Sequence, residues 1–203
     1  ISIVVPCFNQ GEYLEDCLDN CYNQSVSPYE IIVVNDGSTD DSAEIAERYM
    51  FKEFPQIESP VRVIHQVNKG LSSARNTGIM NATGDYILPL DADDMLMETC
   101  AEKILAMAEK TDADVIAPSF KTFGISNQEV ILSGAIHLKD FVGANRIGYF
   151  SAVKRLVLLE IGGYSPRMTW VYEDYHLWFD IFKRGKTLCV IQEPLVLYRT
   201  KEA

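Results

Sequence analysis

At residues 85–94 the chain reads DYILPLDADD. An apolar segment typical of a buried strand is followed at once by three carboxylates in four positions, and holding several anions together away from water is costly without a counter-charge. Residues two apart on an extended chain point to the same side, so we expect Asp91 and Asp93 to direct oxygens to one point. Such oxygens suit a hard divalent cation, Mg²⁺ or Mn²⁺, of the kind that commonly holds a diphosphate. The alternative is that these acids favour the dipole of a helix expected from about Met97.

A second acidic turn follows another predicted strand. Residues 29–35 read YEIIVVN and residues 36–42 read DGSTDDS. Gly37 permits a tight turn, and residues 38–41 are suitable N-caps for the helix that follows. Capping does not account for Asp36, which lies at the strand end, where open parallel sheets hold ligands. Asp36 is therefore placed to accept hydrogen bonds from a base N–H or a ribose hydroxyl.

The chain opens with the same arrangement. Residues 1–6, ISIVVP, predict a strand, and the loop CFNQG comes next. Phe8, just past this strand, is able to stack on a flat base, or else to fill the core as phenylalanines commonly do.

Strands and helices alternate through about Phe120. Further strands are predicted at 61–64 and 115–120, and helices at 71–80 and 98–110. This rhythm predicts an α/β fold with a mainly parallel open sheet and helices on both faces. The less regular residues 121–147 predict an edge hairpin and a loop.

Four runs carry a resemblance, in this order: VPCFN at 5–9, VNDGSTD at 34–40, NKGLSSARN at 68–76 and LDADD at 90–94. Together they strongly resemble family 2 glycosyltransferases of the GT-A fold. The second half continues the match less specifically, with EIGGY at 160–164, ED at 173–174 and PLVLYR at 194–199. The resemblance implies a single GT-A catalytic domain over residues 1–203, with a Rossmann-like nucleotide-sugar-binding half at 1–120 and a smaller acceptor-side half at 121–203. We expect the chain to be a fragment of a longer protein.

The resemblance also implies a donor site and a metal site. The donor-binding residues would be Pro6, Phe8, Asn9, Asp36, Asn68, Arg75, Asp91 and Ala92. Asp91 and Asp93, as a DXD motif, would hold Mn²⁺ or Mg²⁺. Arg75 would lie beside Asp36 and Asp93, where a cation lowers the cost of keeping them ionised. Its alternative is a salt-bridged surface arginine.

Glu173 and Asp174 precede a predicted amphipathic helix. By resemblance they are catalytic, with Asp174 the general base, although acidic residues also simply favour a helix start. One base and one metal site imply inversion at the anomeric carbon. Trp170 and Trp178 are candidates for stacking on a sugar, but the helical spacing of Trp178 is typical of a core residue.

Composition restricts the partners. The formal net charge of −11 argues against nucleic acid. Five cysteines without a Cys-x-x-Cys pair indicate buried thiols and a reducing compartment. No apolar run approaches the roughly 18 residues of a membrane helix. We therefore expect a cytoplasmic protein, with peripheral association at the inner face of the membrane.

The predicted function is inverting transfer of a sugar from a nucleotide diphosphate sugar, most simply a UDP-sugar, to a saccharide or lipid-linked acceptor in cell-envelope polysaccharide or glycoconjugate synthesis. One alternative is a sugar-nucleotide nucleotidyltransferase, which should show a glycine-rich basic loop. Residues 6–12 contain one glycine and no lysine or arginine. Another alternative is a non-catalytic glycan- or nucleotide-binding module.

One departure from the family pattern concerns residues 200–203, TKEA, where many family members carry a histidine. Either that ligand lies beyond the fragment or water takes its place.

Overall fold

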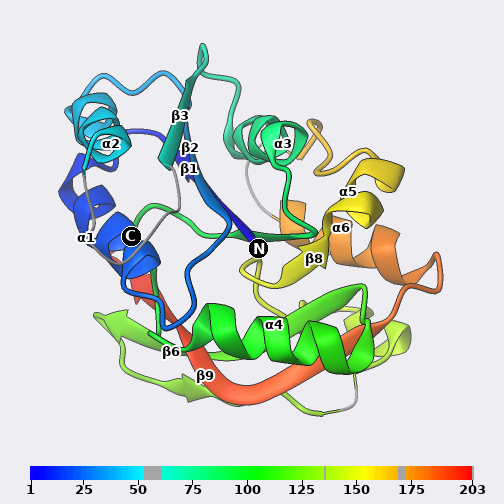
Figure 1. The fold of residues 1–203 in the computed structure, drawn as a ribbon. Coiled ribbons are helices and arrows are strands. Elements are labelled where there is room, and N and C mark those ends of the chain that lie inside the picture. Colours follow the sequence, from blue (N-terminus) through cyan, green and yellow to red (C-terminus); the bar gives the residue numbers. More distant parts are fainter. Residues whose placement is uncertain (53–60, 135, 169–171, 203) are drawn as a thin grey trace.

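A computed structural model describes residues 1–52, 61–134, 136–168 and 172–202. They form one nine-stranded sheet with helices on both faces (Figure 1). The strands follow one another across the sheet in the order β3 (Val61–His65), β2 (Glu30–Asn35), β1 (Ser2–Cys7), β4 (Tyr86–Pro89), β8 (Ala152–Lys154), β6 (Val115–Gly124), β9 (Leu188–Thr200) and β5 (Met95–Leu96), and β7 (Glu129–Val130) pairs with β6 outside this path.

The sheet has a parallel half and a mixed half. Strands β3, β2, β1 and β4 are all parallel. Beyond β4, strand β8 pairs antiparallel with β4 and with β6, and β6 and β9 are again parallel. Strands β1, β2 and β4 are buried along their whole length, as expected for parallel strands covered on both faces. The α/β prediction is confirmed, and β7 supplies the predicted edge hairpin on β6.

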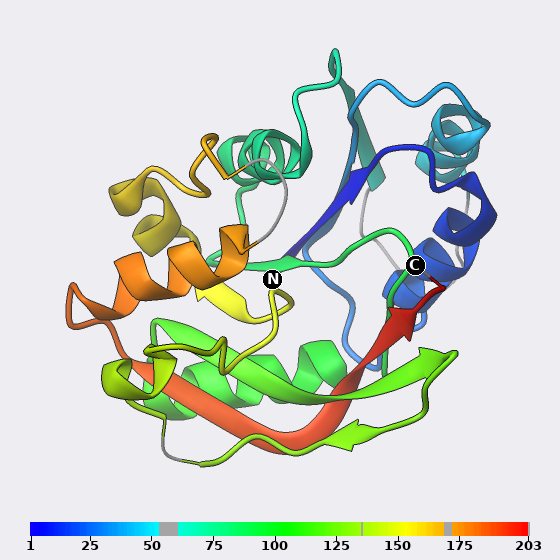
Figure 2. The same cartoon turned by 180° about the vertical axis from the view of Figure 1, so that it is seen from behind.

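Six helices of the described residues cover the sheet, three on each face. One face carries α1 (Gly11–Tyr22), α2 (Ser42–Met50) and α4 (Cys100–Thr111), and the other carries α3 (Leu71–Asn81), α5 (Arg155–Ile161) and α6 (Glu173–Phe182), with the short 3₁₀ turn η1 (Leu138–Phe141) beside α6. Figures 1 and 2 show α4 alongside β6 and β9, away from α3, α5 and α6. Alternation along β1 explains the two layers, since Ile3 and Val5 join one core and Val4 the other.

Two predicted helix starts need correction. Helix α4 begins at Cys100 rather than near Met97, because Met95 and Leu96 form β5 and pair with β9. The N–H of Met97 is also used, as a donor to the carbonyl of Leu195 at 2.8 Å. Glu173 and Asp174 do not precede α6 but are its first two residues.

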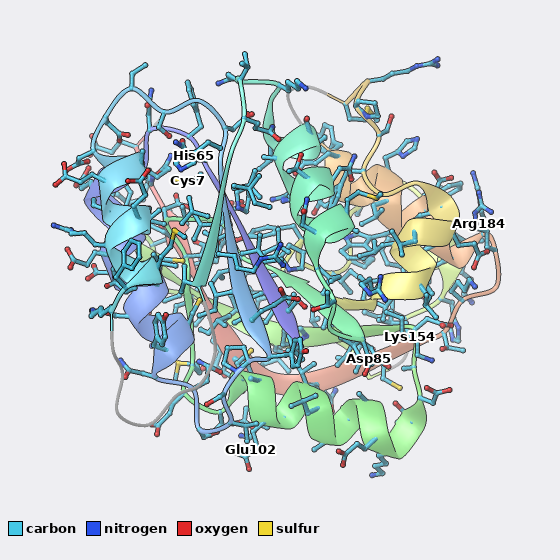
Figure 3. The ribbon with its side chains drawn as sticks, turned by 45° about the horizontal axis from the view of Figure 1, so that its top comes forward. Cys7, His65, Asp85, Glu102, Lys154 and Arg184 are labelled. Atoms are coloured by element: carbon cyan, nitrogen blue, oxygen red, sulfur yellow. The ribbon has the colours of Figure 1, made fainter. Side chains whose placement is uncertain are left out.

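The carboxyl ends of the parallel strands lie together at one edge of the sheet. Figure 3 shows Cys7 and His65, the last residues of β1 and β3, close together and far from Asp85 and Lys154 at the other edge. The loops carrying Phe8 and Asp36 leave from the first edge. Along the part of the chain that the structure describes, no helix combines the length and apolarity needed to cross a membrane. All five cysteines are free, and four of them are buried.

Candidate functional site

A cavity of about 520 Å³ opens at the carboxyl ends of β1, β2 and β4. Its lining residues are Pro6, Cys7, Phe8, Gln10, Asp36, Asn68, Gly70, Leu71, Ala74, Asp91, Ala92 and Asp93. The cavity thus brings together most of the residues expected at a donor site, and Asn9 and Arg75 are not among those lining it. Its volume is in the range of small-molecule and cofactor sites.

Asp36 is buried in the cavity wall and is held by three hydrogen bonds. Its Oδ1 accepts from Nε2 of Gln66 at 2.6 Å and from the N–H of Lys69 at 2.9 Å, and its Oδ2 accepts from the N–H of Gly70 at 2.8 Å. The Gln66 amide is oriented in turn by the Thr77 hydroxyl, 2.6 Å from its Oε1. A carboxylate has about four acceptor positions, so Asp36 keeps room for one ligand donor. Nothing in the sequence pattern singles out Gln66.

Phe8 and Asn9 are neighbours in the sequence but have different surroundings in the structure. The Phe8 side chain lines the cavity and is 46% exposed, so it does not fill the core. Asn9 has a positive φ of 51°, and its Oδ1 accepts from the N–H of Thr39 at 2.8 Å. Asn9 therefore joins two loops at the strand ends through its Oδ1, and its contact with the donor stays a prediction.

Residues 91–94 form a turn and not an extended segment, since the N–H of Asp94 donates to the carbonyl of Asp91 at 3.0 Å. The reasoning that placed Asp91 and Asp93 on one side of a strand is wrong, yet the turn still places both at the cavity. Asp94 is buried and does not line the cavity. Its Oδ1 accepts a hydrogen bond from the N–H of Arg199 at 2.6 Å, and its Oδ2 accepts one from the hydroxyl of Tyr149. Burial raises the pKa of Asp94 to about 8.

Arg75 lies between two acids that are distant in sequence. Its Nη2 donates to Oδ1 of Asp91 at 2.7 Å, and its Nη1 donates to Oε1 of Glu173 at 2.6 Å. The predicted neighbours Asp36 and Asp93 have other partners, so this detail of the prediction is corrected. Arg75 is only 1% exposed, and its guanidinium connects the acidic turn after β4 to the start of α6.

Lys201 lies in residues 200–203, shortly after the Tyr198-Arg199 pair, the region where many family members carry a histidine. Its Nζ is 2.8 Å from Oδ2 of Asp93 and 3.1 Å from Oε1 of Gln10. Arg199 adds a bond from its Nε to the carbonyl of Asp93 at 2.8 Å. The basic end of β9 therefore contacts the acidic turn, a pairing that no sequence motif indicates.

The two carboxylates suit a divalent cation. Within the described residues, Oδ2 of Asp91 and Oδ1 of Asp93 accept no hydrogen bond, and both side chains line the cavity. No group of three or more His, Cys, Asp and Glu in those residues is arranged to hold a metal ion. Mg²⁺ is commonly bound through one or two carboxylates, with waters and substrate phosphates completing its shell. Asp91 and Asp93 fit that pattern, and Nζ of Lys201 forms an ion pair with one oxygen of Asp93.

A second cavity, of about 310 Å³, contains Asp174. Its other lining residues are Phe120, Val130, Leu132, Asn145, Arg146, Ile147, Gly148, Tyr149, Phe150 and Tyr198. Oδ2 of Asp174 accepts from Nδ2 of Asn145 at 2.7 Å, and Oδ1 accepts from the N–H of Tyr175 at 2.7 Å. Burial and, after it, the charge of Glu173 raise the pKa of Asp174. Asp174 is the only carboxylate among the described residues that line this aromatic cavity.

Of the two tryptophans, only Trp178 lies among the described residues, and it adds no stacking surface to either cavity. Trp178 is fully buried in the core beneath α6, as its helical spacing indicated. Trp170 lies outside the residues that the structure describes.

Comparison with known proteins gives a consistent result. A family model described as Glycosyl transferase family 2 matches residues 2–176. The uncharacterized glycosyltransferase EpsJ of Bacillus subtilis is 42% identical over 120 residues, which are 59% of this chain and 33% of EpsJ. Glycosyltransferase GlyG of Streptococcus pneumoniae is 39% identical over 128 residues, 63% of this chain and 41% of GlyG. The matched segments therefore cover less than half the length of these relatives.

A solved structure has the same fold. The crystal structure of S. aureus TarS 1–349 in complex with UDP-GlcNAc aligns with a TM-score of 0.84, covering 100% of this chain and 59% of that chain. The sequence identity is 18%, so the likeness concerns the fold alone.

Proposed function

Since the chain belongs to glycosyl transferase family 2, we propose that it transfers a sugar from a nucleotide diphosphate sugar to an acceptor hydroxyl, with inversion at the anomeric carbon. We take the donor to be a UDP-sugar, because the TarS structure with the same fold is a complex with UDP-GlcNAc. The acceptor would be a saccharide or a lipid-linked saccharide, used in cell-envelope polysaccharide or glycoconjugate synthesis. Cytoplasmic action at the inner face of the membrane belongs to the same proposal.

One observation carries the proposal. Arg75 bonds to Asp91, which lines the first cavity, and to Glu173, the neighbour of Asp174 in the second cavity. A displacement reaction needs a leaving group and an attacking group held next to each other. The guanidinium of Arg75 joins the two acidic segments that would serve these groups.

The first cavity would bind the donor. The exposed ring of Phe8 offers a face for the base, and Asp36 offers its remaining acceptor position to a base N–H or a ribose hydroxyl. Asp91 and Asp93 would hold Mn²⁺ or Mg²⁺, which supplies charge stabilisation for the leaving diphosphate.

The second cavity would bind the acceptor, with Asp174 as the base. A carboxylate oxygen of Asp174 takes the proton of the acceptor hydroxyl. The hydroxyl oxygen forms its bond to the anomeric carbon as the bond from this carbon to the diphosphate breaks, and the diphosphate leaves. The raised pKa of Asp174 brings its basicity closer to neutral pH, which favours this role.

The test is a panel of nucleotide sugars, assayed for hydrolysis and for transfer to saccharide acceptors with Mn²⁺, together with Asp174→Asn. We expect Asp174→Asn to bind UDP nearly as the parent does and to lose transfer by about 10²-fold or more, the scale of general-base catalysis. Glu173→Gln should be milder. Asp180→Asn is the matched control, because Asp180 lies on the same helix and pairs with Lys183.

Three other outcomes would contradict the proposed function or its assignment of residues. Full transfer by Asp174→Asn with a dead Glu173→Gln would exchange their roles. Synthesis of a nucleotide sugar from a sugar phosphate and a nucleoside triphosphate would favour the nucleotidyltransferase alternative. Binding of UDP without turnover of any donor would favour a non-catalytic module.

A further inference from the structure

Tyr149 lies between the two cavities and contributes to both sides. Its ring lines the second cavity, together with Phe150 and Tyr198. Its hydroxyl reaches the acidic turn, whose residues Asp91 and Asp93 line the first cavity. The buried side chain of Tyr149 thus lines the second cavity and also forms hydrogen bonds with the turn at the first cavity.

Two hydrogen bonds fix the hydroxyl. The N–H of Asp91 donates to it at 3.0 Å, and the hydroxyl donates to Oδ2 of Asp94. The direction of both bonds is consistent, because a phenol accepts one hydrogen bond while donating another. The two partners are the first and last residues of the turn that presents Asp91 and Asp93.

Three side chains hold the ring of Tyr149. The guanidinium carbon of Arg75 lies 4.7 Å from its centroid, and the ring meets Phe150 at 5.1 Å and Tyr198 at 6.4 Å in edge contacts. Cation–π and edge-to-face contacts at these distances are attractive. The hydroxyl is therefore attached to a ring with little freedom to move.

We infer that Tyr149 is a positioning residue for the donor site: its hydroxyl holds the Asp91–Asp94 turn from the acceptor side. The inference rests on the proposed function for the role of the turn, but the hydrogen bonds that carry it are independent of any ligand. A phenylalanine would pack equally well, so a purely structural ring has no need of the hydroxyl. A buried hydroxyl is unfavourable unless it is hydrogen-bonded, and both bonds made here end on the turn.

The test compares Tyr149→Phe with Tyr86→Phe. Tyr86 is a matched control, because it is also buried and its hydroxyl donates one hydrogen bond, to the carbonyl of Ala113 at 2.6 Å, at the opposite edge of the sheet. Both variants keep the ring, so both should fold.

Two measurements are made on the whole chain. Hydrogen exchange of the Asp91 amide should be about tenfold faster or more in Tyr149→Phe and unchanged in Tyr86→Phe. Affinity for UDP in the presence of Mn²⁺, measured by calorimetry, should fall about tenfold in Tyr149→Phe only, as expected for the loss of two hydrogen bonds.

The remaining outcomes overturn the inference. Unchanged exchange at Asp91 would mean that Tyr149 does not hold the turn. Faster exchange with the parent's UDP affinity would mean that the turn's position does not matter to the donor, and equal losses in Tyr86→Phe would reduce the effect to general destabilisation. A parent protein that does not bind UDP with Mn²⁺ contradicts the proposed function instead, and the exchange measurement then decides alone whether Tyr149 holds the turn.

Discussion

Single charged residues decide the electrostatics of the site. Arg75 is buried, with one acid on each side, and a buried ion pair that loses one partner leaves an uncompensated charge. Among the described residues, Asp174 has no such cation in hydrogen-bond contact, and its bonded partners there are the neutral groups of Asn145 and Tyr175. Burial first, and the charge of Glu173 second, raise the pKa of Asp174.

This arrangement predicts a pH dependence. A general base works when it is deprotonated, so the rate should fall as the pH drops through the raised pKa of Asp174. Glu173→Gln removes a negative charge beside Asp174 and should move the acid limb of the kcat/KM profile to lower pH. The measurement is the profile between about pH 4 and pH 8. Glu160→Gln, which alters an exposed pair with Lys186, is the control, and an acid limb that stays in place or moves upward in Glu173→Gln contradicts the assignment.

At the scale of elements, helix α3 determines where Arg75 lies. The helix begins after Gly70, whose N–H is bonded to Asp36, and it packs against β1 through Gly78. A Cβ on Gly78 would lie 2.2 Å from Cγ1 of Val4, and a valine has little rotamer freedom to move away. The close approach of α3 to the sheet therefore depends on the absence of a side chain at this position.

Gly78→Ala should consequently lower the free energy of unfolding by about 1–3 kcal/mol, the usual range for overpacking, even though alanine is the better helix former. Urea denaturation measures this change. Met80→Ala is the control on the same helix, because Met80 is 72% exposed, and it should stay within about 0.5 kcal/mol of the parent. A Gly78→Ala protein as stable as the parent would show that α3 is free to shift on β1.

At the scale of the whole molecule, the two cavities belong to the two halves of the sheet. The first cavity lies at the ends of the parallel strands, and the second cavity is formed by β6, β9, α6 and residues 145–150. Arg199, near the end of β9, and Lys201, just after this strand, also contact the acidic turn. A ligand bound at this turn would contact segments from both halves and should stabilise the entire fold.

UDP with Mn²⁺ at about a hundred times its Kd should add about 2.7 kcal/mol of stability, or about 5–10 °C in Tm for a chain of this size. Thermal unfolding with and without a chelator measures the effect. Asp93→Ala should abolish the metal-dependent shift, whereas Asp85→Ala, at the far edge of the sheet in Figure 3, should keep it. A shift that survives chelation would show that UDP binds without a metal.

The sequence by itself determined the alternation of strands and helices, the open sheet, and the polar residues that follow individual strands. These features depend on periodicity and on short turns, which act within a few residues of the chain. They were sufficient to place Phe8, Asp36, Asp91 and Asp93 at one edge, because the carboxyl ends of parallel strands necessarily meet there.

Only the tertiary structure decided how the site is connected. Arg75 contacts Glu173, 98 positions away, and the hydroxyl of Tyr149 reaches Asp94, 55 positions away, and neither pairing leaves a pattern in the local sequence. The local sequence likewise predicts extended chain at residues 91–94, whereas the structure has a turn. The Tyr149 hydroxyl accepts a hydrogen bond from the N–H of Asp91 and donates one to Asp94, and the N–H of Arg199 also donates to Asp94, so groups distant in sequence help to shape this turn. Contacts of this kind depend on how the helices pack on the sheet, and that packing is set by the whole core at once.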